Sequence, residues 1–454
     1  MVRRWRALGA IAGSVLLFTG CSLETNAPDP DVITRRIRAN SLAWIDQTSK
    51  PLASIEPTAN DADLAPLDAM VGAAHVVGMG NDTYGAHEAF ALERRVFQHL
   101  VEHMGFTALG IEATMPEAFA LDDYVRTGRG DPAALVSRLF AWNWKTSELL
   151  DLIAWIRQHN ATVPADQQVG FYGFDVPAPA GAIDSVVAYV RRVAPVLAPA
   201  EEDDYSCLST YRNDQAGVFE HDYSKATTLW PFCTPRVADA YNALVANRAT
   251  LEAGSSPAQF ARALQLARVV VQWESVERGA MARDAAMAEN ATWILQHANG
   301  GAQSKVFLWA HNAHVGRIAS TSYASMGAYL STLLLTNYLP IGFAFGSGSF
   351  NAQGIDGSGN ITPTVRVMTT SAPRTGSFEE VLQSSRNSAF YFDMRQDTPD
   401  DVTSWLVGPE WLRVVGTAYD PTAPDSFFQP ANLTGLVDVM VFVRTVTPTR
   451  LVGQ

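Results

Sequence analysis

The sequence predicts an α/β protein in which helices flank a central, mainly parallel sheet and a helical insertion caps a cleft. Short apolar runs alternate with stretches of helical periodicity, as in parallel sheets that are covered on both faces. Of the 454 residues, 47% are hydrophobic and 17% are charged, which excludes a disordered chain. The net charge of −13 argues against a nucleic-acid partner, because such proteins need a basic surface.

The N-terminal segment has the pattern of an export signal. Arg3, Arg4 and Arg6 precede an apolar stretch, Ala7–Phe18, that is too short to cross ~30 Å of hydrocarbon as a helix. Small residues follow and lead to Cys21. This arrangement resembles a bacterial lipoprotein signal, which is cleaved before the cysteine and acylated on its thiol. An ordinary secretory signal with an incidental cysteine is the alternative.

These features predict the organisation of the chain. Residues 1–20 are the signal, residues 21–40 a flexible tether rich in Pro, Asp and Asn, and residues 41–454 a single α/β domain. We expect the protein to be exported and lipid-anchored to the bacterial membrane through Cys21, facing the periplasm or the exterior. Segment 177–256 breaks the strand–helix alternation and is expected to be the capping insertion.

The two other cysteines, Cys207 and Cys233, both lie in this insertion. Outside the cytosol they can form a disulfide, which would stabilise the fold by roughly 3 kcal/mol for a loop of this length. Two unpaired buried thiols are the alternative. Neither cysteine lies in a nucleophile motif, so we predict a structural role for the pair.

Seven apolar runs are predicted as strands. In chain order they are His75–Met79, Ala108–Ile111, Val169–Phe174, Val306–Trp309, Ile341–Phe345, Ala389–Phe392 and Val437–Val443. Helices are predicted between them from apolar residues spaced three and four apart. The clearest are Glu88–His103, Ser147–His159, Ala258–Gln272 and Arg278–His297.

Polar residues follow the first four of these strands. They are Asn81, Tyr84 and His87 after the first strand, then Glu112, then Asp175, and finally His311 and His314. Because ligands of open α/β sheets bind beyond the carboxyl ends of the strands, we expect these side chains to meet at one rim. Their shared position is more specific than any single residue.

His311 and His314 have the spacing H-x-x-H. A turn after the strand can bring both imidazoles to one centre, where they would act as a base or as an electrostatic clamp for an oxyanion. A metal pair is another reading, but no third and fourth ligand stand out, so we predict no metal and no other cofactor. The structural alternative is an imidazole that hydrogen-bonds the loop backbone.

The other rim residues also allow two interpretations each. Glu112 ends an apolar strand, where a buried carboxylate is costly unless it is paired or faces a cleft. It is therefore either a general base or the group that orients a histidine. The structural alternative is a carboxylate at the N-terminus of the next helix. Tyr84 and His87 would share a helical face, unless His87 merely begins the helix. Asp175 is a site carboxylate or a helix cap, and Arg283 is an anchor or part of a surface ion pair.

Together these motifs resemble the erythromycin esterase-like family of hydrolases. The matching segments are Gly85–Glu88 with the helix to His103, Gly105–Glu112, Trp142–Trp144, Leu152–Asn160, Gly170–Asp175, Arg283–Asp284 with Met287–Trp293, and Trp309–Val315. Their order and spacing agree over residues 70–350. The resemblance implies a deep cleft in an α/β fold, and cleavage of a macrolide lactone by general-base activation of water without a covalent acyl-enzyme.

The first site motif departs from the family pattern. The family usually reads G-E-x-x-H-G, with the histidine as general base, whereas this chain reads G-N-D-T-Y-G from Gly80 to Gly85. Asn81 replaces the carboxylate and Tyr84 replaces the base, and Glu93 stands where the family often has Arg. A tyrosine with an ordinary pKa of ~10 is a poor base at neutral pH.

Three hypotheses follow from this departure. In the first, the protein still hydrolyses an ester or lactone, with His87, His311 or His314 as base and Tyr84 donating to the oxyanion. In the second, Tyr84 is the acid of an elimination or rearrangement. In the third, the protein is an inactive lipoprotein that binds a hydrophobic ligand. The residues expected to contact a small ester or macrolide-like ligand are Asn81, Asp175, Arg283 and Trp144.

Overall fold

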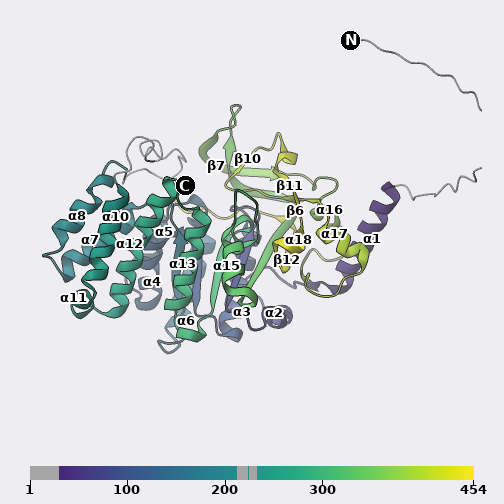
Figure 1. Cartoon of the computed structure of the whole chain (residues 1–454). Helices are drawn as coiled ribbons and strands as arrows, with labels where there is room; N and C mark the ends of the chain where they lie inside the picture. Colours follow the sequence, from purple (N-terminus) through teal and green to yellow (C-terminus); the bar gives the residue numbers. More distant parts are fainter. Residues whose placement is uncertain (1–29, 212–222, 224–232, 454) are drawn as a thin grey trace, which may run out of the picture.

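A computed structural model describes residues 30–211, 223 and 233–453 (Figure 1). Six parallel strands form the centre of its ten-stranded main sheet. From one edge inward they are β4 (Gly170–Asp175), β3 (Ala108–Thr114), β5 (Val306–His311), β2 (Val76–Asn81), β6 (Tyr338–Ile355) and β12 (Val439–Val446). β8 (Ala389–Asp393) and β1 (Lys50–Pro51) extend the sheet in antiparallel pairing. Helices lie on both faces, so the predicted α/β fold is confirmed.

All seven predicted strands are present, but β6 is much longer than the predicted Ile341–Phe345. It continues past Gly346 and Gly348 and pairs with β7 (Ile361–Thr370) and with β10 (Ala418–Tyr419). This part of β6 is rich in glycine and polar residues, so it lacks the apolar pattern from which strands are predicted. A separate two-stranded sheet pairs β9 (Glu410–Arg413) with β11 (Phe428–Ala431).

The four predicted helices are confirmed as α3 (His87–Met104), α6 (Ser147–Asn160), α12 (Pro257–Glu277) and α13 (Arg283–His297). The side chain of Thr146 caps α6, and that of Ser256 caps α12, each by accepting a hydrogen bond from a first-turn backbone amide. α13 begins later than predicted, because Gly279 adopts a φ of +68° and interrupts the helix. Arg283 therefore lies in the first turn of α13.

The N-terminal helix α1 (Pro30–Thr48) corrects the boundary of the predicted tether. Arg36 and Asn40 hydrogen-bond Asp401 of α17 (Asp400–Val407), and Trp44 is buried further along α1. The folded part thus begins before residue 41, because the polar start of α1 is held by a segment that is remote in the sequence. Residues 1–29, and with them Cys21, lie outside the described residues.

The described part of the insertion is helical. Its helices are α7 (Ala180–Val193), α8 (Ala198–Tyr205), α10 (Cys233–Ala246) and α11 (Arg248–Ala253). Cys207 and Cys233 form the predicted disulfide, with their Cα atoms 5.8 Å apart. α7 and α10 pack against α12 at one end of the molecule (Figure 1). Tyr223 also donates a hydrogen bond to Glu274, near the end of α12 and thus near the loop that leads to Arg283.

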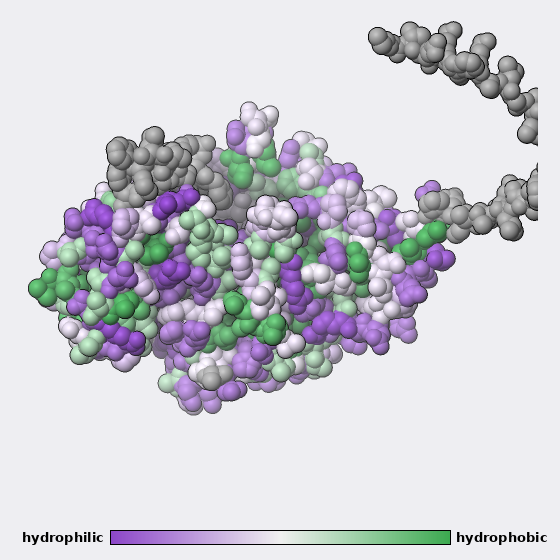
Figure 2. All heavy atoms as spheres, viewed as in Figure 1, coloured by the Kyte–Doolittle hydropathy of each residue, from purple (hydrophilic) through white to green (hydrophobic). Residues whose placement is uncertain are grey.

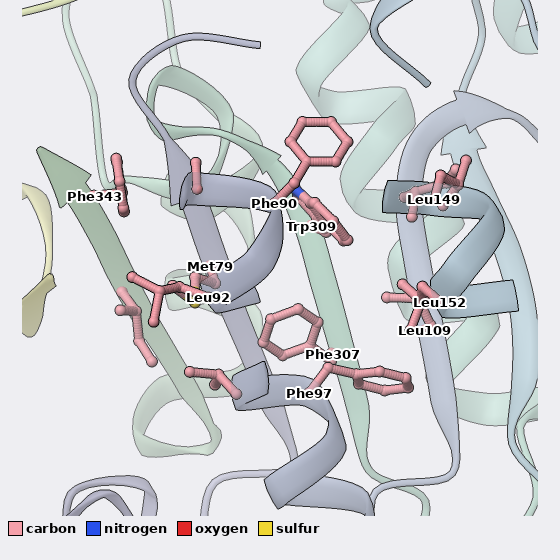
Figure 3. Close-up of a cluster of buried hydrophobic side chains, with 14 of the residues drawn as sticks. Met79, Phe90, Leu92, Phe97, Leu109, Leu149, Leu152, Phe307, Trp309 and Phe343 are labelled. Atoms are coloured by element: carbon pink, nitrogen blue, oxygen red, sulfur yellow. The ribbon is translucent and has the colours of Figure 1, made fainter. Parts of the chain in front are cut away.

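A large apolar core lies between the sheet and helices α3 and α6 (Figure 3). Within it, the Trp309 ring contacts Phe90 and Trp144, with ring centroids 4.8 and 5.4 Å apart. Such aromatic pairs contribute about 0.5–1.5 kcal/mol each beyond the burial of their area. Trp309 lies on β5 two residues before His311, so this packing holds the end of β5 in place.

The remaining α-helices complete both layers. They are α2 (Ala65–Val71), α4 (Met115–Thr127), α5 (Pro132–Ser137), α14 (Asn312–Val315), α15 (Met326–Leu334), α16 (Phe378–Leu382) and α18 (Leu433–Leu436). Across the described ranges, no helix has the length and apolar character needed to cross a membrane.

On the face shown in Figure 2, hydrophilic residues are spread between small hydrophobic areas.

Candidate active site

The candidate site lies where four parallel strands end. Asn81, Asp175 and His311 are the last residues of β2, β4 and β5, and Glu112 lies near the end of β3. The pairing of β3 with β4 is irregular on either side of Glu112, between Ile111 and Thr114. Irregularities of this kind redirect a side chain next to a site. The four residues thus lie at the carboxyl ends of neighbouring parallel strands, at one edge of the sheet.

The carboxylate of Glu112 is the centre of the site. The Tyr84 hydroxyl lies 2.9 Å from both carboxylate oxygens and donates to them. Nη2 of Arg283 donates to Oε1, and the backbone amide of His311 donates to Oε2, each at 3.1 Å. Nε2 of His314 lies 3.4 Å from Oε1. These donors take the place of the water that a buried carboxylate would otherwise need.

Arg283 joins Glu112 to the end of β4. Its Nε and Nη2 donate to the two carboxylate oxygens of Asp175, at 2.8 and 2.7 Å. Burial would raise the pKa of Asp175, but the Arg283 guanidinium holds it below its ordinary value. The Arg283 side chain is 38% exposed, so part of it is accessible to solvent. Arg283 is therefore an anchor of the site, rather than part of a surface ion pair.

His314 has one ring nitrogen held by a carboxylate and the other directed at the centre of the site. Nδ1 donates to Asp284 at 2.8 Å, and Asp284 also accepts from the Tyr323 hydroxyl at 3.2 Å and the Met326 amide at 2.8 Å. Burial alone would lower the pKa of His314, but the Glu112 carboxylate and the hydrogen bond to Asp284 raise it above its ordinary value. An imidazole with one nitrogen bound to a carboxylate is a common arrangement of acid–base groups.

His311 is held by the protein backbone at both ring nitrogens. Nδ1 accepts from the Ala313 amide at 3.1 Å, and Nε2 donates toward the carbonyl oxygens of Val415 and Asp82 at 3.2 and 3.3 Å. Burial, followed by the charge of His314, lowers the pKa of His311 to about 4. The ring is therefore neutral at neutral pH and has no lone pair left for a substrate. Of the two readings of this histidine, the structure favours the imidazole that hydrogen-bonds the backbone.

Tyr84 is a hydrogen-bond donor in this site and not a base. Burial and then the Glu112 charge raise its pKa well above the ordinary value, so that its hydroxyl keeps the proton. The Tyr84 ring lies against the His311 ring, with centroids 5.2 Å apart. This packing fixes the hydroxyl over Glu112.

Comparison with known proteins shows the family of this chain. The family model described as erythromycin esterase matches residues 101–446. The chain belongs to the erythromycin esterase family. This membership confirms the family expected from the motifs, and it supports a hydrolase-type function for the chain.

Three proteins that are similar to this erythromycin esterase family member cover most of its length. YbfO of Bacillus subtilis (strain 168), which carries the name of a hydrolase, is 23% identical over 396 residues, covering 81% of this chain and 84% of YbfO. A Bacillus cereus protein of known crystal structure is 27% identical, with a TM-score of 0.77 and coverage of 91% of this chain and 99% of that one. A mutant of the erythromycin esterase EreC in its open conformation has a TM-score of 0.66 at 17% identity, with coverage of 90% and 99%.

Three of the residues predicted for the site lie apart from the Glu112 carboxylate in this family member. The His87 ring points to Glu148 at 2.8 Å and to Glu56 at 3.5 Å, because His87 begins α3 and its side chain faces α6. Asn81 is fully buried beside Glu93. Trp144 is also fully buried, and its indole donates to the backbone oxygen of Glu112 at 2.8 Å. Trp144 thus supports the strand below the site and is not placed to touch a ligand.

Two residues of the site were not assigned a role from the sequence. Asp284 is adjacent to Arg283 in a matching family segment, so a signal for it was present. Tyr323 carries no motif, and its hydroxyl reaches Asp284 only because the loop before α15 folds back over α13. Neither its position in the sequence nor its neighbours indicate this contact.

Proposed function

We propose that this protein is an exported hydrolase that cleaves a carboxylic ester or lactone, with His314 as the general base that activates water. Membership of the erythromycin esterase family and the likeness to YbfO support hydrolase chemistry. The observation that carries the assignment of the base is the difference between the two histidines. Both ring nitrogens of His311 are bound to the backbone. In His314 only Nδ1 is held, by Asp284, and Nε2 lies 3.4 Å from Glu112 with no backbone hydrogen bond among the described residues.

In the proposed reaction, water attacks the carbonyl carbon of the ester while its proton passes to Nε2 of His314. The carbonyl π electrons move to oxygen, and the resulting oxyanion is stabilised by a cationic donor. Arg283 supplies that charge, because it is partly exposed and its hydrogen bonds to Asp175 and Glu112 use Nε and Nη2, which leaves Nη1 for the substrate. When the C–O bond breaks, the leaving alkoxide takes the proton from His314. The products are an acid and an alcohol.

Glu112 and Asp284 act through His314 in this proposal. Both carboxylates favour the imidazolium that forms when the water proton is taken up. Glu112 is itself a weak candidate for the base, because Tyr84, Arg283 and the His311 amide already donate to its two oxygens. Tyr84 and Arg283 thus keep Glu112 in place as a fixed negative charge below the reacting atoms.

A panel of carboxylic esters and lactones tests the proposal. We expect turnover with at least one class, and His314→Ala should reduce kcat/KM by about 10²–10⁴-fold, the usual contribution of a positioned base. His297→Ala is a matched control, since His297 is an exposed helical histidine that bonds only the backbone oxygen of Trp293 among the described residues. Equal activity of His314→Ala and the wild type would contradict the assignment of the base.

An inactive, ligand-binding lipoprotein is a second candidate function, and the Tyr84 contact favours it. Tyr84 occupies the place of the family's usual base and covers both oxygens of Glu112. If the wild type binds macrolide-like ligands without turnover and Tyr84→His confers hydrolysis, this candidate replaces ours. A product that lacks the added water would instead support the Tyr84-assisted elimination or rearrangement.

We also propose that the protein is held at the bacterial membrane through acylated Cys21. The sequence around Cys21 supports this, and the first described helix begins only at Pro30, which leaves a short connection between the two. Cell fractionation tests the proposal. The wild type should enter the membrane fraction and Cys21→Ser should not, and a Cys21→Ser protein that still partitions with membranes would contradict it.

A further inference from the structure

A second cluster of ionisable side chains lies at the far end of α3. His99 and His103 are one helical turn apart in the last two turns of this helix, and Asp61 faces both of them. Oδ2 of Asp61 lies 2.8 Å from Nδ1 of His99 and 2.9 Å from Nε2 of His103. The residues of this cluster share no hydrogen-bond or ion-pair partner with Glu112, Arg283 or His314 among the described residues, so the cluster is distinct from the site around Glu112.

We propose that Asp61, His99 and His103 bind a divalent transition-metal ion such as Zn²⁺. One atom from each residue, a carboxylate oxygen or a ring nitrogen, lies within 4.8 Å of the other two. A tetrahedral zinc ion with bonds of 2.0–2.2 Å needs ligand atoms about 3.3 Å apart. Small rotations of these side chains therefore reach the required geometry. Two imidazoles and one carboxylate are a ligand set typical of zinc.

The surroundings of His99 are those of a metal ligand. Its second nitrogen, Nε2, lies 2.7 Å from Oδ1 of Asp68. Nδ1 of His99 faces the Asp61 oxygen at 2.8 Å. A cation placed between these two atoms would be coordinated by both, with Nε2 still held by Asp68. A carboxylate that holds the second nitrogen is the usual support of a metal-bound histidine.

The segment that carries Asp61 and Asp68 is fixed in place by a buried ion pair. Arg95 of α3 is 1% exposed, and it donates to Asp63 and, at 2.7 Å, to the backbone oxygen of Ser54. This contact presents Asp61 to the histidine face of α3. A groove of about 750 Å³, which Asp61 and His99 help to line, borders the cluster and gives water access as a fourth ligand.

The proposed ion joins the segment before α2 to the end of α3, so it stabilises the folded chain. A ligand that binds only the folded state raises the midpoint of thermal unfolding. The proposed zinc site shares no residue with the Glu112 site. It is tested by zinc binding and by thermal unfolding, so the test does not depend on the proposed hydrolase activity.

Zinc titration of the full-length chain, purified without a histidine tag and carrying Cys21→Ser, tests this inference. Competition with a zinc-responsive dye should give one high-affinity ion per chain, and zinc should raise the unfolding temperature. Asp68→Asn should weaken zinc binding by about 10–100-fold, the usual effect of removing the group that supports a metal-bound histidine. His103→Ala should weaken it at least as much. Because the His103 side chain is 48% exposed, this variant should fold normally.

Two further variants make the result decisive. His297→Ala should bind zinc as the parent does. His314→Ala should also keep the high-affinity site, and loss of zinc binding in this variant would place the ion at Glu112 and overturn the inference. The inference is equally overturned if the parent chain binds no zinc, or if His103→Ala and the parent bind it with the same affinity and stoichiometry.

Discussion

The Tyr84 hydroxyl donates to both carboxylate oxygens of Glu112, at 2.9 Å from each. This contact gives both oxygens of the Glu112 carboxylate a hydrogen-bond donor inside the protein. Glu112 is almost fully buried and needs donors on both oxygens. The tyrosine provides one that spans them, while Arg283 and the His311 amide complete the set.

Replacing Tyr84 by Phe should destabilise the fold. The substitution keeps the ring contact with His311 but removes a hydrogen bond to a buried carboxylate, and such bonds contribute about 1.5–3 kcal/mol. We expect the free energy of unfolding to fall by that amount in urea titrations at neutral pH. Tyr329→Phe is a control, since this helical tyrosine makes no hydrogen bond to Glu112. An unchanged urea midpoint for Tyr84→Phe would show that the bond contributes nothing.

The pH dependence of hydrolysis should report His314. A base acts in its deprotonated form, so kcat/KM should rise with pH through a pKa above the ordinary 6.5 of histidine. Asp284→Asn removes the negative charge that helps to raise this pKa, and the rising limb should move to lower pH. Tyr323→Phe keeps Asp284 and serves as the control. If Asp284→Asn leaves the limb in place, the group that titrates is not His314.

The position of the rim could be predicted from the sequence, and for a physical reason. Glu112, Asp175 and His311 follow apolar runs, and the carboxyl ends of parallel strands must meet at one edge of the sheet. His314 was placed at the same rim because it follows the strand that ends at Trp309, and Arg283 lies in a matching family segment. These are properties of local pattern and order along the chain.

The roles of the two histidines could not be predicted in the same way. Nε2 of His311 is held by the carbonyl oxygen of Val415, and Nδ1 of His314 is held by Asp284. Val415 is more than a hundred residues away from His311, and its segment has no strand or helix pattern that would place it there. His87 was placed at the site because its spacing from Tyr84 suggested a shared helical face. In the structure its ring points instead to Glu148 on α6.

The disulfide between Cys207 and Cys233 should stabilise the protein. The two residues are 26 positions apart, and closing a loop of this length is worth about 3 kcal/mol in the chain-entropy model. The double variant Cys207→Ser with Cys233→Ser should therefore unfold at a lower urea concentration than the oxidised wild type. Reductant should lower the midpoint of the wild type toward that of the variant and leave the variant unchanged. A wild-type midpoint that is insensitive to reductant would contradict this prediction.

Replacing Arg283 by Met should show how far the site depends on its cation. The change leaves the carboxylates of Asp175 and Glu112 buried without their shared partner, which should cost about 3 kcal/mol of unfolding free energy near neutral pH. Since the wild-type pKa of Asp175 is lowered, its contribution to stability is present above the unfolded-state pKa of ~3.9 and is lost as the pH falls through the folded-state value. The difference between Arg283→Met and the wild type should therefore shrink in acid.

Arg268 provides the matched control for this last measurement. It pairs with Glu289 at 2.8 Å and is about as exposed as Arg283, but Glu289 is 48% exposed whereas Asp175 is 5% exposed. Ion pairs with an exposed carboxylate contribute about 0–1 kcal/mol. Arg268→Met should therefore change the unfolding free energy little, and without the acid-dependent convergence. Equal losses in the two variants would mean that Arg283 acts as an ordinary surface residue. A large loss of unfolding free energy in Arg283→Met alone, together with a lower kcat/KM, would support a double role for Arg283. Its guanidinium would then hold the carboxylates and also stabilise the oxyanion.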